Sequence, residues 1–427
     1  MPSSAESARI VGSLGLPGDL LPRHLRPLVL EALADTRVVL VLGARQVGKS
    51  TLTRDVAIRD YPAQILTLDD KTTRDAASSD PTGFVAALSQ PALIDEVQRA
   101  PDLLLAIKES VDLDQRPGRF LLTGSANILT APKIYEALTG RVEILNLWPL
   151  SQSEIERTSE NVVDRLFGGT PPLIAGAPVG REAWVTRATA GGYPEARLRP
   201  SLRRSRWFRS YLTTLVERDL RDIADAHKLH QVPRLLRLIA GQAAGLFAPT
   251  NIAGRMGLDK KTVQSYTDLL ETVFVVRRVQ AWRPGIGSRE VQHEKIYVVD
   301  SGLLMHLLGS NESRLSGDGQ TAGKVFENFV AMEIARHVDW AETVARQYHY
   351  RQRDDEVDVV LEAQSGELVA IECKAAATVR HSDYRPIEKL RDARGDAFVA
   401  GYVVYCGAST VPLADRIWAL PVGALWQ

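Results

Sequence analysis

The sequence has few cysteines, no long hydrophobic run and no excess of charge of either sign. Its 427 residues include two cysteines, Cys373 and Cys406, which argues against a disulfide framework and for a reducing compartment. No apolar run approaches the roughly 20 residues that a membrane span needs, and residues 1–18 lack the basic and apolar regions of a signal peptide. We therefore expect a soluble, cytoplasmic protein with no membrane partner.

The balance of charge gives no argument for a nucleic-acid partner at the level of the whole molecule. The chain has 52 basic and 52 acidic residues, so its formal net charge is zero. A nucleic-acid partner can therefore be argued only from where basic residues gather. The contents of 45% hydrophobic and 24% charged residues are those of an ordinary globular protein. A chain of this length predicts roughly two to four domains.

Strand-like apolar runs alternate with helical or loop segments in the first third of the chain. The runs cover residues 38–42, 65–68, 92–94, 119–123 and 142–145. Alternation of this kind is typical of an α/β domain with a mostly parallel sheet. We assign residues 20–155 to this domain.

Three further segments follow the first domain. Residues 156–231 are rich in Gly and Pro at first and then helical, which predicts a lid or linker. Residues 232–290 combine helical patterns, a tight turn at 256–258 and a strand-like run at 273–279, which predicts a winged-helix unit. Residues 291–427 predict a C-terminal α/β domain.

A phosphate-binding loop follows the first apolar run. Residues 43–50 satisfy the pattern G-x-x-x-x-G-K-[ST] between a predicted strand and a predicted helix. We expect Lys49 to reach the β- and γ-phosphates of ATP and the Ser50 hydroxyl to ligate Mg²⁺. The residues predicted to contact the nucleotide are Gly43, Ala44, Arg45, Gln46, Val47, Gly48, Lys49, Ser50 and Thr51.

Paired carboxylates end the apolar run at residues 92–94 and resemble the Walker B motif of AAA ATPases. Asp95 is predicted to hold Mg²⁺, and Glu96 to orient or deprotonate the attacking water. Thr123 and Ser125 follow the next run, where a polar sensor of the γ-phosphate is expected, although a plain turn fits equally well.

Arg141 is a further catalytic candidate. An arginine at this position can stabilise transition-state charge in its own subunit, or toward a neighbouring subunit of a homo-oligomer. A surface salt bridge is the alternative interpretation.

Two basic segments are candidates for nucleic-acid contacts. Residues 197–221 hold eight arginines, for which a solvated helix face is the simpler interpretation. The second predicted helix of the winged-helix unit begins at residue 260, and such helices also serve as lids or dimer contacts. The arginines are Arg197, Arg199, Arg203, Arg204, Arg206, Arg209, Arg218 and Arg221, and the polar residues of the second segment are Lys260, Lys261, Thr262, Gln264 and Ser265.

Several motifs taken together resemble one prokaryotic family. They are the phosphate loop, Leu68-Asp69-Asp70, Asp95-Glu96-Val97-Gln98, Leu122-Thr123-Gly124-Ser125, Gly191-Gly192-Tyr193-Pro194-Glu195 and a closing Glu-x-Lys. The chain is similar to AAA-type ATPases whose C-terminal half is a domain of unknown function with a restriction-endonuclease-like fold. The resemblance covers residues 23–376 and departs from the usual motif at Ala44 and Ser50.

The resemblance gives the C-terminal carboxylates a predicted role. Residues 354–361 and 368–374 form a hairpin pattern that can bring Asp358 beside Glu372, with Lys374 on the face of Glu372. In restriction-endonuclease-like nucleases such carboxylates bind Mg²⁺ or Mn²⁺ and the lysine helps to activate water. Glu327, on a predicted helix, resembles the acidic residue that completes such sites. The alternatives are charges that face water, and a nuclease-like fold retained for binding alone.

Two functions from different classes fit these features. The first is an ATPase that couples nucleotide turnover to nucleic-acid binding or processing through its winged-helix and nuclease-like domains. The second is a nucleotide-dependent regulatory switch that binds DNA or a protein partner without nuclease chemistry.

Overall fold

The computed structural model describes residues 20–124, 139–171, 178–220, 226–284 and 293–427, and their fold is mixed α/β. The chain divides into two compact units. The first runs to Leu145 without residues 42–47 of the phosphate loop, which group with the second unit. The second unit continues to the C-terminus. The four predicted segments are a finer division, which these units do not test.

The first unit is built on a five-stranded sheet with the strand order β2-β3-β4-β1-β5. Strands β2 and β3 pair in parallel, as do β3 and β4. Every residue of β1, β3 and β4 is buried, which is typical of parallel strands covered on both faces. The strands are β1 (Val38–Leu42), β2 (Gln64–Thr67), β3 (Ala92–Asp95), β4 (Phe120–Gly124) and β5 (Val142–Asn146), which confirms all five predicted runs.

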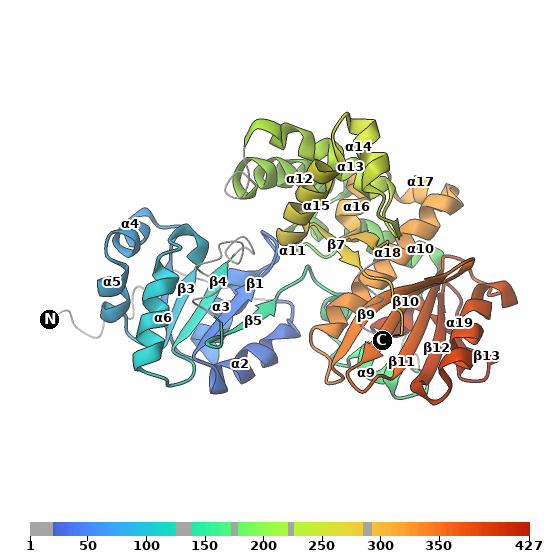
Figure 1. Cartoon of the computed structure of the whole chain (residues 1–427), viewed down its shortest axis with the longest axis horizontal. Helices are drawn as coiled ribbons and strands as arrows, with labels where there is room; N and C mark the ends of the chain where they lie inside the picture. Colours follow the sequence, from blue (N-terminus) through green and yellow to red (C-terminus); the bar gives the residue numbers. More distant parts are fainter. Residues whose placement is uncertain (1–19, 125–138, 172–177, 221–225, 285–292) are drawn as a thin grey trace. The chain divides into compact units, whose positions relative to one another are not determined.

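Helices follow most strands of this unit. Because β3 and β4 run parallel, their carboxyl ends lie side by side, and β1 is the next strand in the sheet (Figure 1). This edge of the sheet is where the phosphate loop begins. The helices are α2 (Leu25–Asp35), α3 (Lys49–Arg59), α4 (Lys71–Ser79), α5 (Pro81–Ala87), the short η1 (Val97–Arg99) and α6 (Leu103–Leu113).

The second unit begins with short helices that pack around aromatic side chains. Tyr193 contacts the rings of Trp207, Phe208 and Tyr211 on α12, and its hydroxyl lies 2.8 Å from that of Tyr211. This cluster fixes the buried side of α12. The elements are α8 (Gln152–Glu156), α9 (Val162–Phe167), α10 (Arg181–Ala190), α11 (Pro194–Arg197), α12 (Ser201–Thr214), η3 (Leu215–Asp219) and η4 (Ala226–Gln231).

Three helices and the strands β6 and β7 lie in the predicted winged-helix segment, and the strand between them, β8, comes from the segment predicted as the C-terminal domain. Gly257 ends α14 in the left-handed conformation, and the Asp259 carboxylate caps the N-terminus of α15. The sheet has the order β6-β8-β7. The elements are α13 (Val232–Gly241), β6 (Gly245–Leu246), α14 (Pro249–Met256), α15 (Lys260–Thr272), β7 (Val276–Val279) and β8 (Lys295–Val298).

The chain ends in a six-stranded mixed sheet with the order β13-β14-β12-β11-β10-β9. Strands β10 and β11 form the predicted hairpin, with Val359 opposite Ile371. Helix α18 contacts β9, β10 and β11, and α19 contacts β10, β11, β12 and β14 (Figure 1). The helices are α16 (Ser301–Leu307), α17 (Glu312–Gly317), α18 (Gly319–Val338) and α19 (His381–Arg394), with η6 (Gly395–Ala397) and η7 (Val422–Leu425). The strands are β9 (Ala345–Gln352), β10 (Asp355–Ala363), β11 (Leu368–Lys374), β12 (Phe398–Tyr405), β13 (Val411–Ala414) and β14 (Ile417–Pro421).

Candidate functional site

The phosphate loop depends on its two glycines. A Cβ atom at Gly43 would lie 2.2 Å from the carbonyl oxygen of Leu147, so no larger residue fits there. Gly48 has a φ of 103° and is the N-cap of α3. The backbone therefore turns directly into a helix N-terminus, which is the geometry that binds phosphate.

Lys49 and Ser50 open helix α3, and Asp95 ends the neighbouring strand β3. Lys49 is 6% exposed. The Ser50 hydroxyl donates a 2.8 Å hydrogen bond to Asp95 Oδ1, and Arg54 Nη2 lies 3.4 Å from Asp95 Oδ2. A hydroxyl and a carboxylate side by side are hard oxygen ligands of the kind that Mg²⁺ prefers, so these residues fit the predicted ion.

Thr123 joins the paired carboxylates. Its buried hydroxyl donates a 2.5 Å hydrogen bond to Asp95 Oδ1 and accepts a 3.0 Å hydrogen bond from the backbone N–H of Glu96. Glu96 itself has a φ of 62°, and its carboxylate accepts a hydrogen bond from Gln98. Gln98, which the sequence offered as part of the family motif without a role, is therefore a contact of the predicted base. Ser125 lies outside the described residues.

Arg141 pairs with a carboxylate on helix α6. Its Nη2 donates a 3.0 Å hydrogen bond to Asp112 Oδ2, and its Nε donates to Asp112 Oδ1. This contact is the surface salt bridge that the sequence left as the alternative. A catalytic role for Arg141 stays a prediction.

The C-terminal carboxylates surround a buried lysine that the sequence did not indicate. Lys295 on β8 is 1% exposed, and its Nζ lies 2.8 Å from Glu327 Oε1, 2.8 Å from Glu356 Oε1 and 2.9 Å from Asp358 Oδ1. Lys295 opens the apolar stretch at residues 296–299, and a charged residue beside such a stretch is the signal that could have found it. Glu327 and Asp358 thus share one cation.

Glu372 and Lys374 complete this group, which we call the carboxylate–lysine cluster: Lys295, Glu327, Glu356, Asp358, Glu372 and Lys374. Lys374 Nζ lies 2.9 Å from Glu372 Oε1, in agreement with the predicted shared face. Burial and the charge of Asp358 raise the pKa of Glu372 well above its usual value. Burial and the same charge, opposed by Lys295, raise the pKa of Glu327 to about 8. Asp358 is therefore close enough to interact with both glutamates.

The cluster does not fit a divalent metal held by Glu327, Asp358 and Glu372. The cation between Glu327 and Asp358 is the Lys295 ammonium, and Asp358 Oδ2 accepts a 2.9 Å hydrogen bond from the backbone N–H of Cys373. Across the described parts of the chain, no three His, Cys, Asp or Glu side chains are arranged so that they could hold a metal ion. We therefore derive no chemistry through a metal at this cluster.

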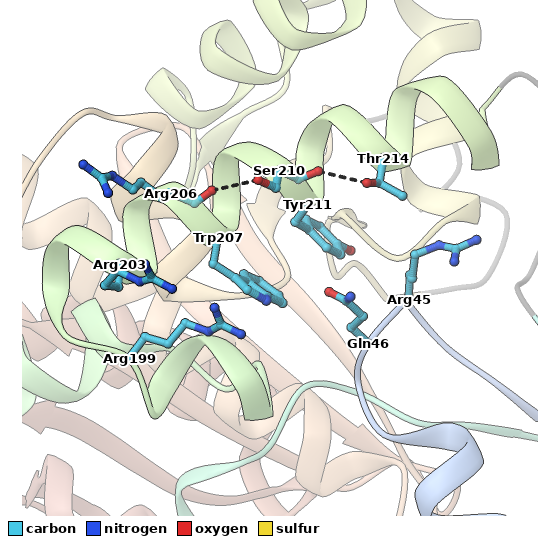
Figure 2. Close-up of a pocket in the computed structure, with 9 residues that line it drawn as sticks. All are labelled: Arg45, Gln46, Arg199, Arg203, Arg206, Trp207, Ser210, Tyr211 and Thr214. Atoms are coloured by element: carbon cyan, nitrogen blue, oxygen red, sulfur yellow. Dashed lines mark hydrogen bonds between the residues drawn. The ribbon is translucent and has the colours of Figure 1, made fainter.

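The arginines of α11 and α12 differ in their surroundings. Arg204 donates to the carbonyl oxygens of Thr189 and Arg199, and Arg199 pairs with Glu195, so both are structural. Arg203 and Arg206 are exposed. Figure 2 shows both side chains on α12. Arg203 and Arg206 line a cavity of about 390 Å³. Its lining comprises Arg45, Gln46, Arg199, Arg203, Arg206, Trp207, Ser210, Tyr211 and Thr214.

The start of helix α15 is also partly structural. The Thr262 backbone N–H and hydroxyl both donate to the Asp259 carboxylate, so Thr262 serves the helix cap. Lys260, Lys261 and Ser265 are exposed, and Gln264 is half-buried. The two lysines are the charges that this helix presents to solvent at its first turn.

Comparison with known proteins places the chain in a family. It is 31% identical over 423 residues to Uncharacterized protein Rv2008c of Mycobacterium tuberculosis and equally to Uncharacterized protein Mb2031c of Mycobacterium bovis. The alignment covers 98% of this chain and 86% of each relative. The chain belongs to their family. A protein of Haemophilus influenzae is 22% identical over 257 residues, which cover 57% of each chain.

Three family models match this member of the family. An AAA domain matches residues 35–156, which include Lys49, Asp95 and Thr123 and support an AAA-type ATPase. A domain of unknown function (DUF8612) matches residues 181–314, and another (DUF4143) matches residues 322–425. Lys295 thus lies in the second matched region, whereas its three carboxylate partners lie in the third. No helix in the described ranges combines the length and apolarity that crossing a membrane requires.

Proposed function

We propose that the chain binds ATP with Mg²⁺ and hydrolyses it. The observation that carries the proposal is the pair of hydrogen bonds to Asp95 Oδ1, from Ser50 of the phosphate loop and from Thr123 of β4. These two bonds bring the phosphate loop and the end of β4 to the carboxylate that ends β3. The AAA-domain match over residues 35–156 supports the same conclusion.

Each residue has a distinct role in this proposal. Lys49 and the backbone N–H groups at the start of α3 hold the phosphates. Ser50 and Asp95 would hold Mg²⁺, which when bound neutralises charge on the phosphates. Glu96 accepts a proton from the attacking water, and Thr123 orients Asp95 and the Glu96 backbone.

An ATPase assay on the full chain tests this function. We expect phosphate release that requires Mg²⁺ and stops on chelation, and a loss of turnover of about 10²-fold in Asp95→Asn. Asp415→Asn is the matched control, because this carboxylate is 79% exposed and pairs with its neighbour Arg416. Equal turnover in Asp95→Asn and Asp415→Asn would contradict the proposal.

We further propose that nucleotide turnover is coupled to nucleic-acid binding. The element order α13, β6, α14, α15, β7, β8 with the sheet order β6-β8-β7 supports a winged-helix interpretation. Arg203 and Arg206, which are exposed on α12, supply cations that suit phosphate contacts. ATPase rates with and without single- and double-stranded DNA test the coupling. An unchanged rate, with no DNA binding at low salt, would contradict it.

The regulatory switch is the second candidate function. In this version the C-terminal domain, which we interpret as nuclease-like, binds DNA or a protein without cleaving it. The contacts of Lys295 favour this version, because a fixed ammonium fills the place where a nuclease would use a metal.

A further inference from the structure

The ammonium of Lys295 lies among three carboxylates. Its Nζ donates hydrogen bonds to Glu327 Oε1 at 2.8 Å and to Asp358 Oδ1 at 2.9 Å, and it forms an ion pair with Glu356 Oε1 at 2.8 Å. The side chain is 1% exposed, so water does not compete for these contacts. A cation of this kind is a built-in part of the cluster.

Three carboxylate oxygens around Lys295 accept hydrogen bonds. Asp358 Oδ1 accepts from Lys295, and Asp358 Oδ2 accepts from the Cys373 backbone N–H. Glu327 Oε1 accepts from Lys295 and from the Tyr297 hydroxyl, at 3.1 Å. Within the described cluster, Glu372 Oε2 is the buried carboxylate oxygen without a hydrogen bond.

We propose that Lys295 is the resident cation of the carboxylate–lysine cluster and takes the place of a divalent metal. Carboxylates that lie together need a cation between them, and Lys295 supplies it permanently. The lysine comes from β8 and its partners from α18 and β10, so the same contacts hold the region of residues 181–314 against that of residues 322–425. The C-terminal domain therefore has no metal-dependent cleavage activity. This inference does not rest on ATP hydrolysis.

A Mn²⁺ titration of the full chain, followed by electron paramagnetic resonance, tests the inference. All variants are made in a background chain that carries Ser50→Ala and Asp95→Asn. These two changes remove the predicted Mg²⁺ ligands of the nucleotide site. We expect no Mn²⁺ bound at the cluster, and therefore the same titration curve after Asp358→Asn is added. Lys295→Met removes the cation and keeps a side chain of similar length. We therefore expect this chain to gain a Mn²⁺ site and to bind Mn²⁺ at least about tenfold more tightly than the chain that keeps Lys295. Adding Asp358→Asn should abolish the new site.

Three outcomes would overturn the inference. The first is Mn²⁺ binding in the background chain that Asp358→Asn removes. The second is Mg²⁺- or Mn²⁺-dependent DNA or RNA cleavage that Glu372→Gln removes. The third is a folded Lys295→Met chain, checked by circular dichroism, that gains no Mn²⁺ site. If Lys295→Met does not fold, the comparison of the background with and without Asp358→Asn decides alone, because both keep Lys295.

Discussion

The Thr123 hydroxyl lies 2.5 Å from Asp95 Oδ1, to which it donates a hydrogen bond, and it accepts a 3.0 Å hydrogen bond from the Glu96 N–H. One side chain on β4 therefore positions both the carboxylate predicted to serve Mg²⁺ and the backbone of the predicted base. A plain turn residue would have no such pair of contacts. This geometry supports a positioning role for Thr123 in the proposed nucleotide site.

Thr123→Val should lower ATP turnover about tenfold or more and destabilise the fold. Valine keeps the shape but leaves the part-buried Glu96 N–H and the Asp95 carboxylate without the Thr123 hydroxyl, which costs about 1–3 kcal/mol of the free energy of unfolding. ATPase rates and urea unfolding measure the two effects. Thr123→Ser restores the hydroxyl and is the control. A Thr123→Val chain with native turnover would show that Thr123 does not position the site.

Lys49→Ala should weaken ATP binding by at least about tenfold while the fold survives. The change removes a charge-assisted contact to phosphate, worth about 1.5–3 kcal/mol. Titration with a fluorescent ATP analogue measures affinity, and circular dichroism measures the fold. Lys71→Ala, at an exposed position in the same unit, is the control. Unchanged affinity in Lys49→Ala would refute the assignment of the phosphate loop.

Glu96→Gln should keep ATP binding and lower turnover by about 10²-fold or more. The amide preserves size but cannot accept a proton from water. Binding and single-turnover hydrolysis are measured on the same preparation. Glu109→Gln, at an exposed position on α6, is the matched control. Parallel losses of binding and turnover would instead make Glu96 structural.

Lys260→Glu together with Lys261→Glu should weaken duplex DNA binding and reduce its dependence on salt. Two fewer phosphate contacts lower the slope of log affinity against log salt by about 2. Fluorescence anisotropy at several salt concentrations measures both quantities. The control is Arg59→Glu together with Lys71→Glu, which makes the same change of charge in the first unit. The Arg59 side chain is 62% exposed, and Lys71 is also exposed. If the two double variants bind DNA alike, helix α15 is not the contact surface.

Most of the first unit could be predicted because its signals are local. Continuous apolar runs fixed the five strands, and the glycines of the phosphate loop are required by the close approach to Leu147 and by the φ of 103° at Gly48. The placement of Asp95 at a strand end also follows from the run before it. What could not be predicted is the contact between Arg141 and Asp112, which lie 29 positions apart.

The sequence by itself determined the phosphate loop, the paired carboxylates and the hairpin that carries Asp358 and Glu372, since each depends on neighbouring residues. Only the tertiary structure decided what lies between the C-terminal carboxylates. Lys295 is 32 positions from Glu327 and 63 from Asp358 along the chain, and it reaches them from a different sheet. Carboxylates that lie together need a cation between them. Which cation fills that place depends on how β8 packs against α18 and brings Lys295 to Asp358 of β10, and no local pattern encodes that packing.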